Sequence, residues 1–163
     1  NHTYFLPYLM GERSPINDTN ARGTFIGMTM DTTRADLVQA VLEGVAFAIR
    51  DSVEIARSLG ITVNSSKVCG GGAKSPLWKK IMANVLNAKL ECLESEQGPG
   101  MGGAMLAMVA CGEYASVQEV CDKFVKVASI VKPEAELVAK YEARYQQFKL
   151  IYPALKAIFP AIQ

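Results

Sequence analysis

Residues 67–78 read KVCGGGAKSPLW, which places three consecutive glycines between an apolar run and the start of a predicted helix. Glycine has no side chain to pack and loses much backbone entropy on folding, so such a run indicates a tight turn or a backbone that something bulky approaches. A glycine turn between a strand and a helix is a common nucleotide site, because free N–H groups and the positive helix end face outward there. Nucleotide binding is therefore the first hypothesis, and a purely structural turn is the alternative.

The residues of this turn match neither of two common nucleotide-binding motifs. The dinucleotide pattern G-x-G-x-x-G would need glycine at position 75, where the chain has Ser75. The P-loop pattern G-x-x-x-x-G-K-[ST] fails because Ala73 precedes Lys74. What remains is a turn against whose bare backbone a flat or bulky group can lie, and a side chain at Gly72 would occupy that space.

Residues for other chemistry are scarce. The only histidine is His2, so the commonest general base is missing from the rest of the chain. The four cysteines form no C-x-x-C pair, and we expect no metal site. Arg13 and Arg22 lie in the polar loop GERSPINDTNARG and are candidates for a cleft loop, because arginine suits phosphate; a solvated loop held by local hydrogen bonds is the alternative.

Charge and hydropathy argue against two classes of partner. Seventeen basic and sixteen acidic residues give a net charge of +1 without a basic stripe, so we expect neither nucleic acid nor an anionic membrane as partner. The sequence has no signal peptide, no apolar span of about 18 residues and no disulfide-like cysteine spacing. It therefore predicts a cytoplasmic protein with reduced thiols.

The elements that position the glycine turn alternate between strands and helices. The capping box of Thr33 and Asp36 starts a helix that ends at Gly60, and Ser75 with Pro76 starts another. The remaining predicted elements are extended chain at 1–10, strands at 24–29, 67–69 and 88–93, helices at 98–112 and 117–127, and a closing helix from about residue 133.

Helical spacing also predicts which faces are buried. In the helix from 34 to 59 the apolar stripe is Leu37, Val38, Val41, Leu42, Val45, Ala46, Ile49, Val53 and Ala56. In the closing helix it is Leu137, Tyr141, Tyr145, Phe148 and Tyr152, which we assign to the core rather than to base stacking. Trp78 is expected to pack under the glycine turn.

This alternation predicts one α/β domain over residues 1–163, with a mixed, partly parallel sheet flanked by helices. Only three or four strands are visible, fewer than the usual five or six, so we expect part of the sheet to be missing from this chain.

Residues 23–43, GTFIGMTMDTTRADLVQAVLE, resemble the second signature of the FGGY carbohydrate kinases. FLPYLMGERSP, NARGTF, LEGVAFAIRD and GGGAKSPLW resemble above all the xylulose-specific branch of that family, and the likeness runs along essentially the whole chain. The resemblance implies an actin-like ATPase (ribonuclease H-like) domain. It also implies that the chain is the larger part of the carboxy-terminal, nucleotide-side domain of a two-domain sugar kinase.

In such a kinase, the resemblance implies that Gly71, Gly72, Ala73 and Ser75 contact the adenosine of ATP. The catalytic aspartate, the phosphate-gripping loops and most of the Mg²⁺ site would lie in the amino-terminal sugar-binding domain, so this chain holds no catalytic residue and is inactive alone. Residues 98–104, GPGMGGA, match a hinge segment usually spelled GPALGAA, from which Gly100, Met101 and Gly103 depart.

Two alternatives stay open at this stage. The sugar acceptor could be gluconate, ribulose or glycerol instead of xylulose. The chain could also be a non-catalytic interaction module that uses its apolar surface for assembly. Its excess of apolar residues further predicts association, for example as a homodimer.

Overall fold

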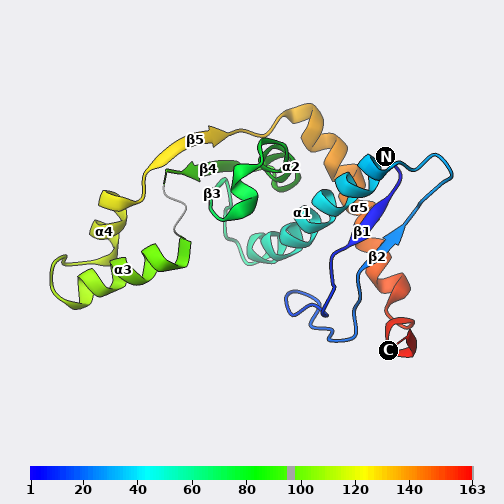
Figure 1. Ribbon diagram of the computed structural model, residues 1–163, viewed down its shortest axis with the longest axis horizontal. Helices are drawn as coiled ribbons and strands as arrows, with labels where there is room; N and C mark the ends of the chain where they lie inside the picture. Colours follow the sequence, from blue (N-terminus) through cyan, green and yellow to red (C-terminus); the bar gives the residue numbers. More distant parts are fainter. Residues whose placement is uncertain (95–97, 163) are drawn as a thin grey trace.

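The computed structural model describes residues 1–94 and 98–162 (Figure 1). The elements in chain order are β1 (Tyr4–Leu6), β2 (Thr24–Ile26), α1 (Arg34–Ser58), β3 (Ser65–Val68), a 3₁₀ helix (Gly71–Lys74), α2 (Pro76–Leu86), β4 (Lys89–Leu93), α3 (Gly98–Ala110), α4 (Val117–Phe124), β5 (Val127–Val131), α5 (Ala135–Leu155) and a second 3₁₀ helix (Phe159–Ile162).

The strands form two separate sheets. β1 pairs antiparallel with β2, and a second sheet has the order β3-β4-β5. In that sheet β3 runs parallel to β4, with Val68 opposite Cys92, whereas β5 runs antiparallel to β4. The predicted mixed sheet is therefore confirmed.

β5 corrects one predicted boundary. The sequence pattern carried a helix to residue 127, whereas α4 ends at Phe124 and Val127–Val131 is a strand. Its sequence VASIV is rich in β-branched residues, and its pairing with Leu90 and Cys92 is a distant contact that helical periodicity does not reveal.

Helix α1 starts where the sequence predicts but turns a different face inward. Thr33 and Asp36 form the capping box, and Gly60 has a φ of +83°. The buried residues of α1 are Ala40, Glu43, Gly44, Ala46 and Phe47. Of the predicted stripe, Ala46 is buried and Leu42 and Val53 pack partly buried against the core, whereas Val38 and Ile49 are exposed. Gly44 explains the shift, because the carbonyl of Phe5 in β1 lies where its side chain would be, and that contact fixes the rotation of the helix.

The aromatic face of α5 packs into the core as predicted. Tyr145 and Phe148 are each 2% exposed, and their rings lie 5.9 and 5.2 Å from the ring of Phe47 in α1. Tyr141 and Tyr152 pack against the same core, and α5 continues through Pro153 to Leu155. This contact holds α1 and α5 together.

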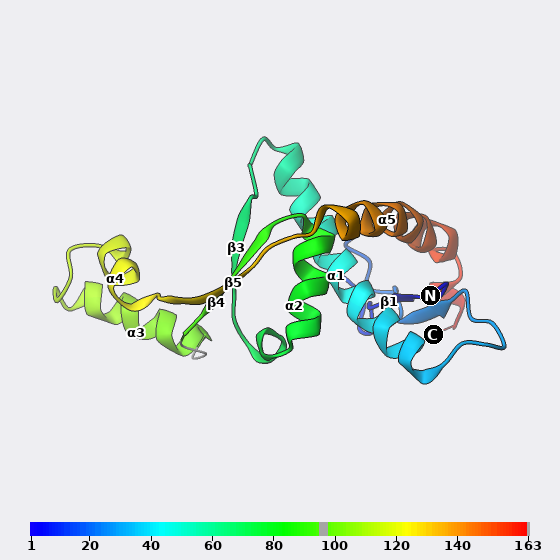
Figure 2. The ribbon, with the colours of Figure 1, turned by 90° about the horizontal axis from the view of Figure 1, so that it is seen from above.

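Two views agree on the arrangement of these elements. α1, α5 and the β1-β2 sheet lie together at one end, the β3-β4-β5 sheet with α2 occupies the middle, and α3 with α4 forms the other end (Figure 2). None of the residues of α3 is buried. Within residues 1–94 and 98–162, no helix combines the length and apolar character needed to cross a membrane.

Candidate functional site

The glycine turn connects the carboxyl end of β3 to the start of α2. Gly70 has a φ of 87° and a ψ of −178°, a backbone conformation that is essentially restricted to glycine. The 3₁₀ helix Gly71–Lys74 follows, and the Ser75 Oγ then accepts a hydrogen bond from the Trp78 backbone N at 3.3 Å. Pro76 takes the first position of α2, as predicted.

The three glycines of the turn differ in whether their position requires glycine. Gly70 supplies the left-handed φ. At Gly72 a Cβ would overlap the indole ring of Trp78, which confirms that this tryptophan packs under the turn. Gly72 is therefore bare because a side chain of the same protein fills the space beside it. Gly71 is exposed, and a Cβ there would meet nothing within 4 Å. Gly71, like the exposed Gly70, therefore presents open backbone to solvent.

Behind the turn lies an unpaired hydrogen-bond donor. The Trp78 Nε1 atom is buried and has no partner among the described residues. A buried N–H without an acceptor in the protein is energetically costly.

A cavity of about 350 Å³ opens at the same edge of the β3-β4-β5 sheet. Its described lining residues are Val68, Cys69, Gly70, Ala73, Lys74, Lys79, Cys92, Leu93, Ala128 and Ser129. Of the predicted contact residues it contains Ala73, whereas Gly71, Gly72 and Ser75 are not part of its wall.

The two loop arginines lie elsewhere. The Arg22 Nη1 atom donates to the carbonyls of Thr19 and Ala21, at 2.9 and 2.8 Å. The loop is also tied to α5, because the Tyr152 hydroxyl donates to Asp18 at 2.7 Å. Neither Arg13 nor Arg22 lines the cavity beside the glycine turn, and the loop between β1 and β2 lies apart from α2 (Figure 1).

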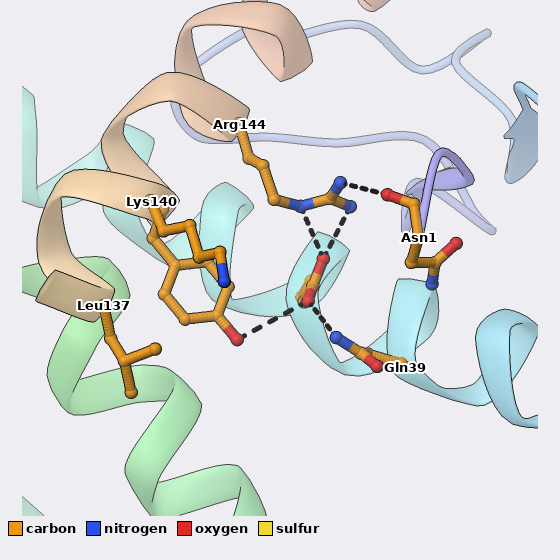
Figure 3. A pocket seen from close by; sticks show the side chains of 7 residues that line it. Asn1, Gln39, Leu137, Lys140 and Arg144 are labelled. Carbon is orange, nitrogen blue, oxygen red and sulfur yellow. Dashed lines mark hydrogen bonds and ion pairs between the residues drawn. The ribbon is translucent and has the colours of Figure 1, made fainter.

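The sequence reading missed a second polar cluster, which lines a cavity of about 360 Å³ between α1 and α5 (Figure 3). Glu43 is 2% exposed, and its Oε2 accepts from the Arg144 Nη2 and Nε atoms at 2.7 and 3.0 Å. Its Oε1 accepts from Gln39 Nε2 at 2.7 Å and from the Tyr141 hydroxyl at 3.5 Å. Both oxygens of this carboxylate therefore have hydrogen-bonding partners within the fold.

Arg144 joins three segments through this cluster. Besides Glu43 it donates to the backbone carbonyls of Asn1, at 2.6 Å, and Thr3, at 3.2 Å. Burial and the negative charge of Glu43 raise the pKa of Tyr141 to about 12, so its hydroxyl stays protonated and can donate. The available sequence signal was one acidic residue, Glu43, within the apolar run VLEGVAFAI.

Comparison with known proteins identifies the family. Residues 1–111 match the C-terminal domain of the FGGY family of carbohydrate kinases. The chain belongs to this family. A xylulose kinase from Staphylococcus epidermidis is 37% identical over 158 residues, which cover 97% of this chain and 32% of that relative. A xylulose kinase from Bacillus subtilis is 36% identical over 163 residues, covering all of this chain and 33% of that relative.

Solved structures of FGGY kinases have the same fold. A xylulose kinase from Brucella ovis matches with a TM-score of 0.87 and 38% identity, over 97% of this chain and 32% of that one. A gluconate kinase from Lactobacillus acidophilus matches with a TM-score of 0.89 and 28% identity, over 99% and 33%. The predicted actin-like α/β fold is confirmed, and the chain spans about a third of the length of these relatives.

Proposed function

We propose that this chain is the nucleotide-side portion of a kinase that, as a complete protein, transfers the γ-phosphoryl group of MgATP to D-xylulose. The observation that carries this proposal is the 36–38% identity, over nearly the whole chain, to proteins named xylulose kinase. On this view residues 1–163 are the larger part of one carboxy-terminal domain. The complete enzyme works in the cytoplasm.

In this proposal the chain supplies a wall for adenosine at the glycine turn. Gly71 presents open backbone, Ala73 lines the adjacent cavity, and Ser75 holds the amino end of α2, whose partial positive charge favours an anionic ligand. Gly72 acts indirectly by seating Trp78. These features support the assignment of Gly71, Ala73 and Ser75 to the nucleotide, with Gly72 contributing only through Trp78.

The remaining chemistry belongs to the amino-terminal sugar-binding domain of the complete kinase. That domain would supply the aspartate that deprotonates or orients the sugar hydroxyl, and most of the Mg²⁺ ligands. Closure of the two domains would exclude water from the phosphoryl transfer. We therefore expect no kinase activity from residues 1–163 alone.

Gluconate is the second candidate acceptor. The structural match to the gluconate kinase of Lactobacillus acidophilus has a TM-score of 0.89, against 0.87 for the xylulose kinase of Brucella ovis. The fold alone therefore does not separate these two acceptors, and the higher sequence identity of 38% against 28% favours xylulose.

The test is a coupled assay of ADP release by the complete protein, offered xylulose, ribulose, gluconate and glycerol with MgATP. We expect kcat/KM to be highest for xylulose. A Cβ at Gly71 meets nothing within 4 Å, and Gly71→Val should raise the KM for ATP about tenfold, corresponding to about 1.4 kcal/mol of binding energy. The KM for xylulose should not change.

Ala139→Val in α5 is the control, because Ala139 is exposed and does not line the cavity beside the glycine turn. It should leave the KM for ATP unchanged. A higher kcat/KM for another sugar would overturn the substrate assignment, and an unchanged KM for ATP in Gly71→Val would overturn the nucleotide site.

A further inference from the structure

An apolar groove lies between α1 and α2, outside the cavity beside the glycine turn. Its volume is about 540 Å³, and its described lining residues are Arg34, Ala35, Val38, Gln39, Leu42, Leu77, Ile81 and Tyr141. Val38 of α1 and Leu77 of α2 are 54% and 60% exposed, although both side chains are aliphatic. Exposure of aliphatic side chains to water is unfavourable, so this surface is suited to contact with another apolar surface.

The two helices that form the groove run in the same direction. Their first turns both contribute to the lining, and at the far end the Arg57 side chain of α1 donates to the Leu86 carbonyl at the end of α2, at 2.7 Å. On α1 the apolar lining extends from Ala35 to Leu42, which is about 10 Å of helix. A groove between two helices accepts the side chains of a third helix, whose backbone groups already pair with one another.

The charge at the groove favours an acidic occupant. Arg34 is exposed and makes no hydrogen bond or ion pair with any described residue, and none of the described lining residues is acidic. Arg34 is also the first residue of α1, where the positive end of the helix favours a nearby carboxylate. In a twofold dimer centred on this surface, a groove would face a groove and Arg34 would face its own copy, so a second chain fits it poorly.

We propose that the groove holds an apolar helix of the complete kinase, which precedes residue 1 and places an acidic residue beside Arg34. The matched family domain is the C-terminal one, and about two thirds of the length of the relatives lies outside the match. Among the described residues β3 pairs only with β4, so the sheet also has an unpaired edge that further polypeptide can fill. The inference rests on the proposed place of this chain in a complete kinase and not on the sugar acceptor.

Photocrosslinking of the complete protein tests the occupant without a substitution. The protein is produced with photoleucine, a leucine analogue that bonds to neighbouring groups on irradiation, and crosslinked peptides are mapped by mass spectrometry. Leu42 and Leu77 report on the groove, whereas Leu150 of α5 is the control, because it is 64% exposed and does not line the groove. A mixture of isotope-labelled and unlabelled protein separates crosslinks within one chain from crosslinks between two copies.

We expect Leu77 to crosslink to a peptide that precedes residue 1 in the same chain, and this crosslink to be absent at Leu150. Crosslinks from Leu77 only to a second copy, or to no segment outside residues 1–163, would overturn the proposal. The samples contain neither ATP nor sugar. A complete protein that released no ADP with any sugar would therefore overturn the proposed function while the crosslinks still decided the occupant.

Arg34→Glu in the complete protein gives a second test, in which the sign of the change decides. A glutamate at the first position of a solvent-exposed helix is stabilising, so an empty groove would leave the Tm unchanged or raise it. Beside an acidic residue of the occupant, the same change should lower the Tm by about 2 °C or more, and Arg34→Gln should fall between the parent and Arg34→Glu. An unchanged or raised Tm for Arg34→Glu would contradict the acidic helix.

Discussion

Replacing Arg144 with methionine should cost more stability than any other single change on α5 that removes a charge. Arg144 is 19% exposed and is the cationic partner of Glu43, which is 2% exposed. Methionine keeps much of the apolar stem of arginine but removes two contacts to the carboxylate, at 2.7 and 3.0 Å, and two to backbone carbonyls. The hydrogen bonds from Gln39 and Tyr141 remain, but neither donor carries a positive charge.

The expected magnitude follows from leaving a buried carboxylate without its counter-charge. Breaking a buried ion pair from one side typically destabilises a protein by about 3–5 kcal/mol, out of a total of about 5–15 kcal/mol. Removing both charges should cost far less, so the double variant Glu43→Gln with Arg144→Met should lie within about 2 kcal/mol of the parent.

Urea unfolding followed by circular dichroism measures these differences. Lys140→Met is the matched control, because Lys140 lies one turn away on α5 and lines the same cavity without contributing to the Glu43 ion pair (Figure 3). It should change the unfolding free energy by less than about 0.5 kcal/mol. A loss of less than about 1 kcal/mol in Arg144→Met, or a double variant as unstable as Arg144→Met alone, would contradict this expectation.

Two further predictions concern the core and the turn. Burial raises the pKa of Asp51 above its usual 3.8, so the folded state favours the protonated form and the parent loses stability as the pH rises from the unfolded to the folded pKa. Asp51→Asn keeps an acceptor for the Tyr145 hydroxyl. The stability of this variant relative to the parent should therefore be greater at pH 7 than at pH 3, and an equal difference at both pH values would contradict this. Gly70→Ala should lower stability by about 1–3 kcal/mol in urea unfolding, because of its left-handed φ. Gly71→Ala should stay within about 0.5 kcal/mol, and equal losses for the two would show that backbone conformation is not the cause.

The sequence predicted those features whose determinants lie within a few residues of one another. The capping box of Thr33 and Asp36, and the start of α2 at Ser75 and Pro76, each depend on side chains within one helical turn. The aromatic spacing along α5 likewise identified its buried face. The family signature at 23–43 was specific enough to predict the actin-like fold without any contact being known.

Features that depend on distant pairing could not be found in this way. Glu43 and Arg144 are 101 positions apart, and nothing local to either residue predicts the other. The glycine at 72 suggested a ligand, whereas the nearest group is the Trp78 ring, because a sequence shows that space is needed but not what fills it. The predicted rotation of α1 was wrong for the same reason, because the observed rotation depends on the contact of the Phe5 carbonyl with Gly44.

The contacts of α5 define how far the structural unit extends. The family match ends at residue 111, yet two carboxylates of α1 take their hydrogen-bonding partners from α5: Glu43 from Arg144, and Asp51 from Tyr145 at 2.6 Å. Phe47 of α1 also packs on Tyr145 and Phe148. A unit that ended at residue 111 would leave a charged carboxylate and an aromatic surface without partners, which is unfavourable on both counts. Helix α5 is therefore part of the domain core, although it lies outside the matched residues.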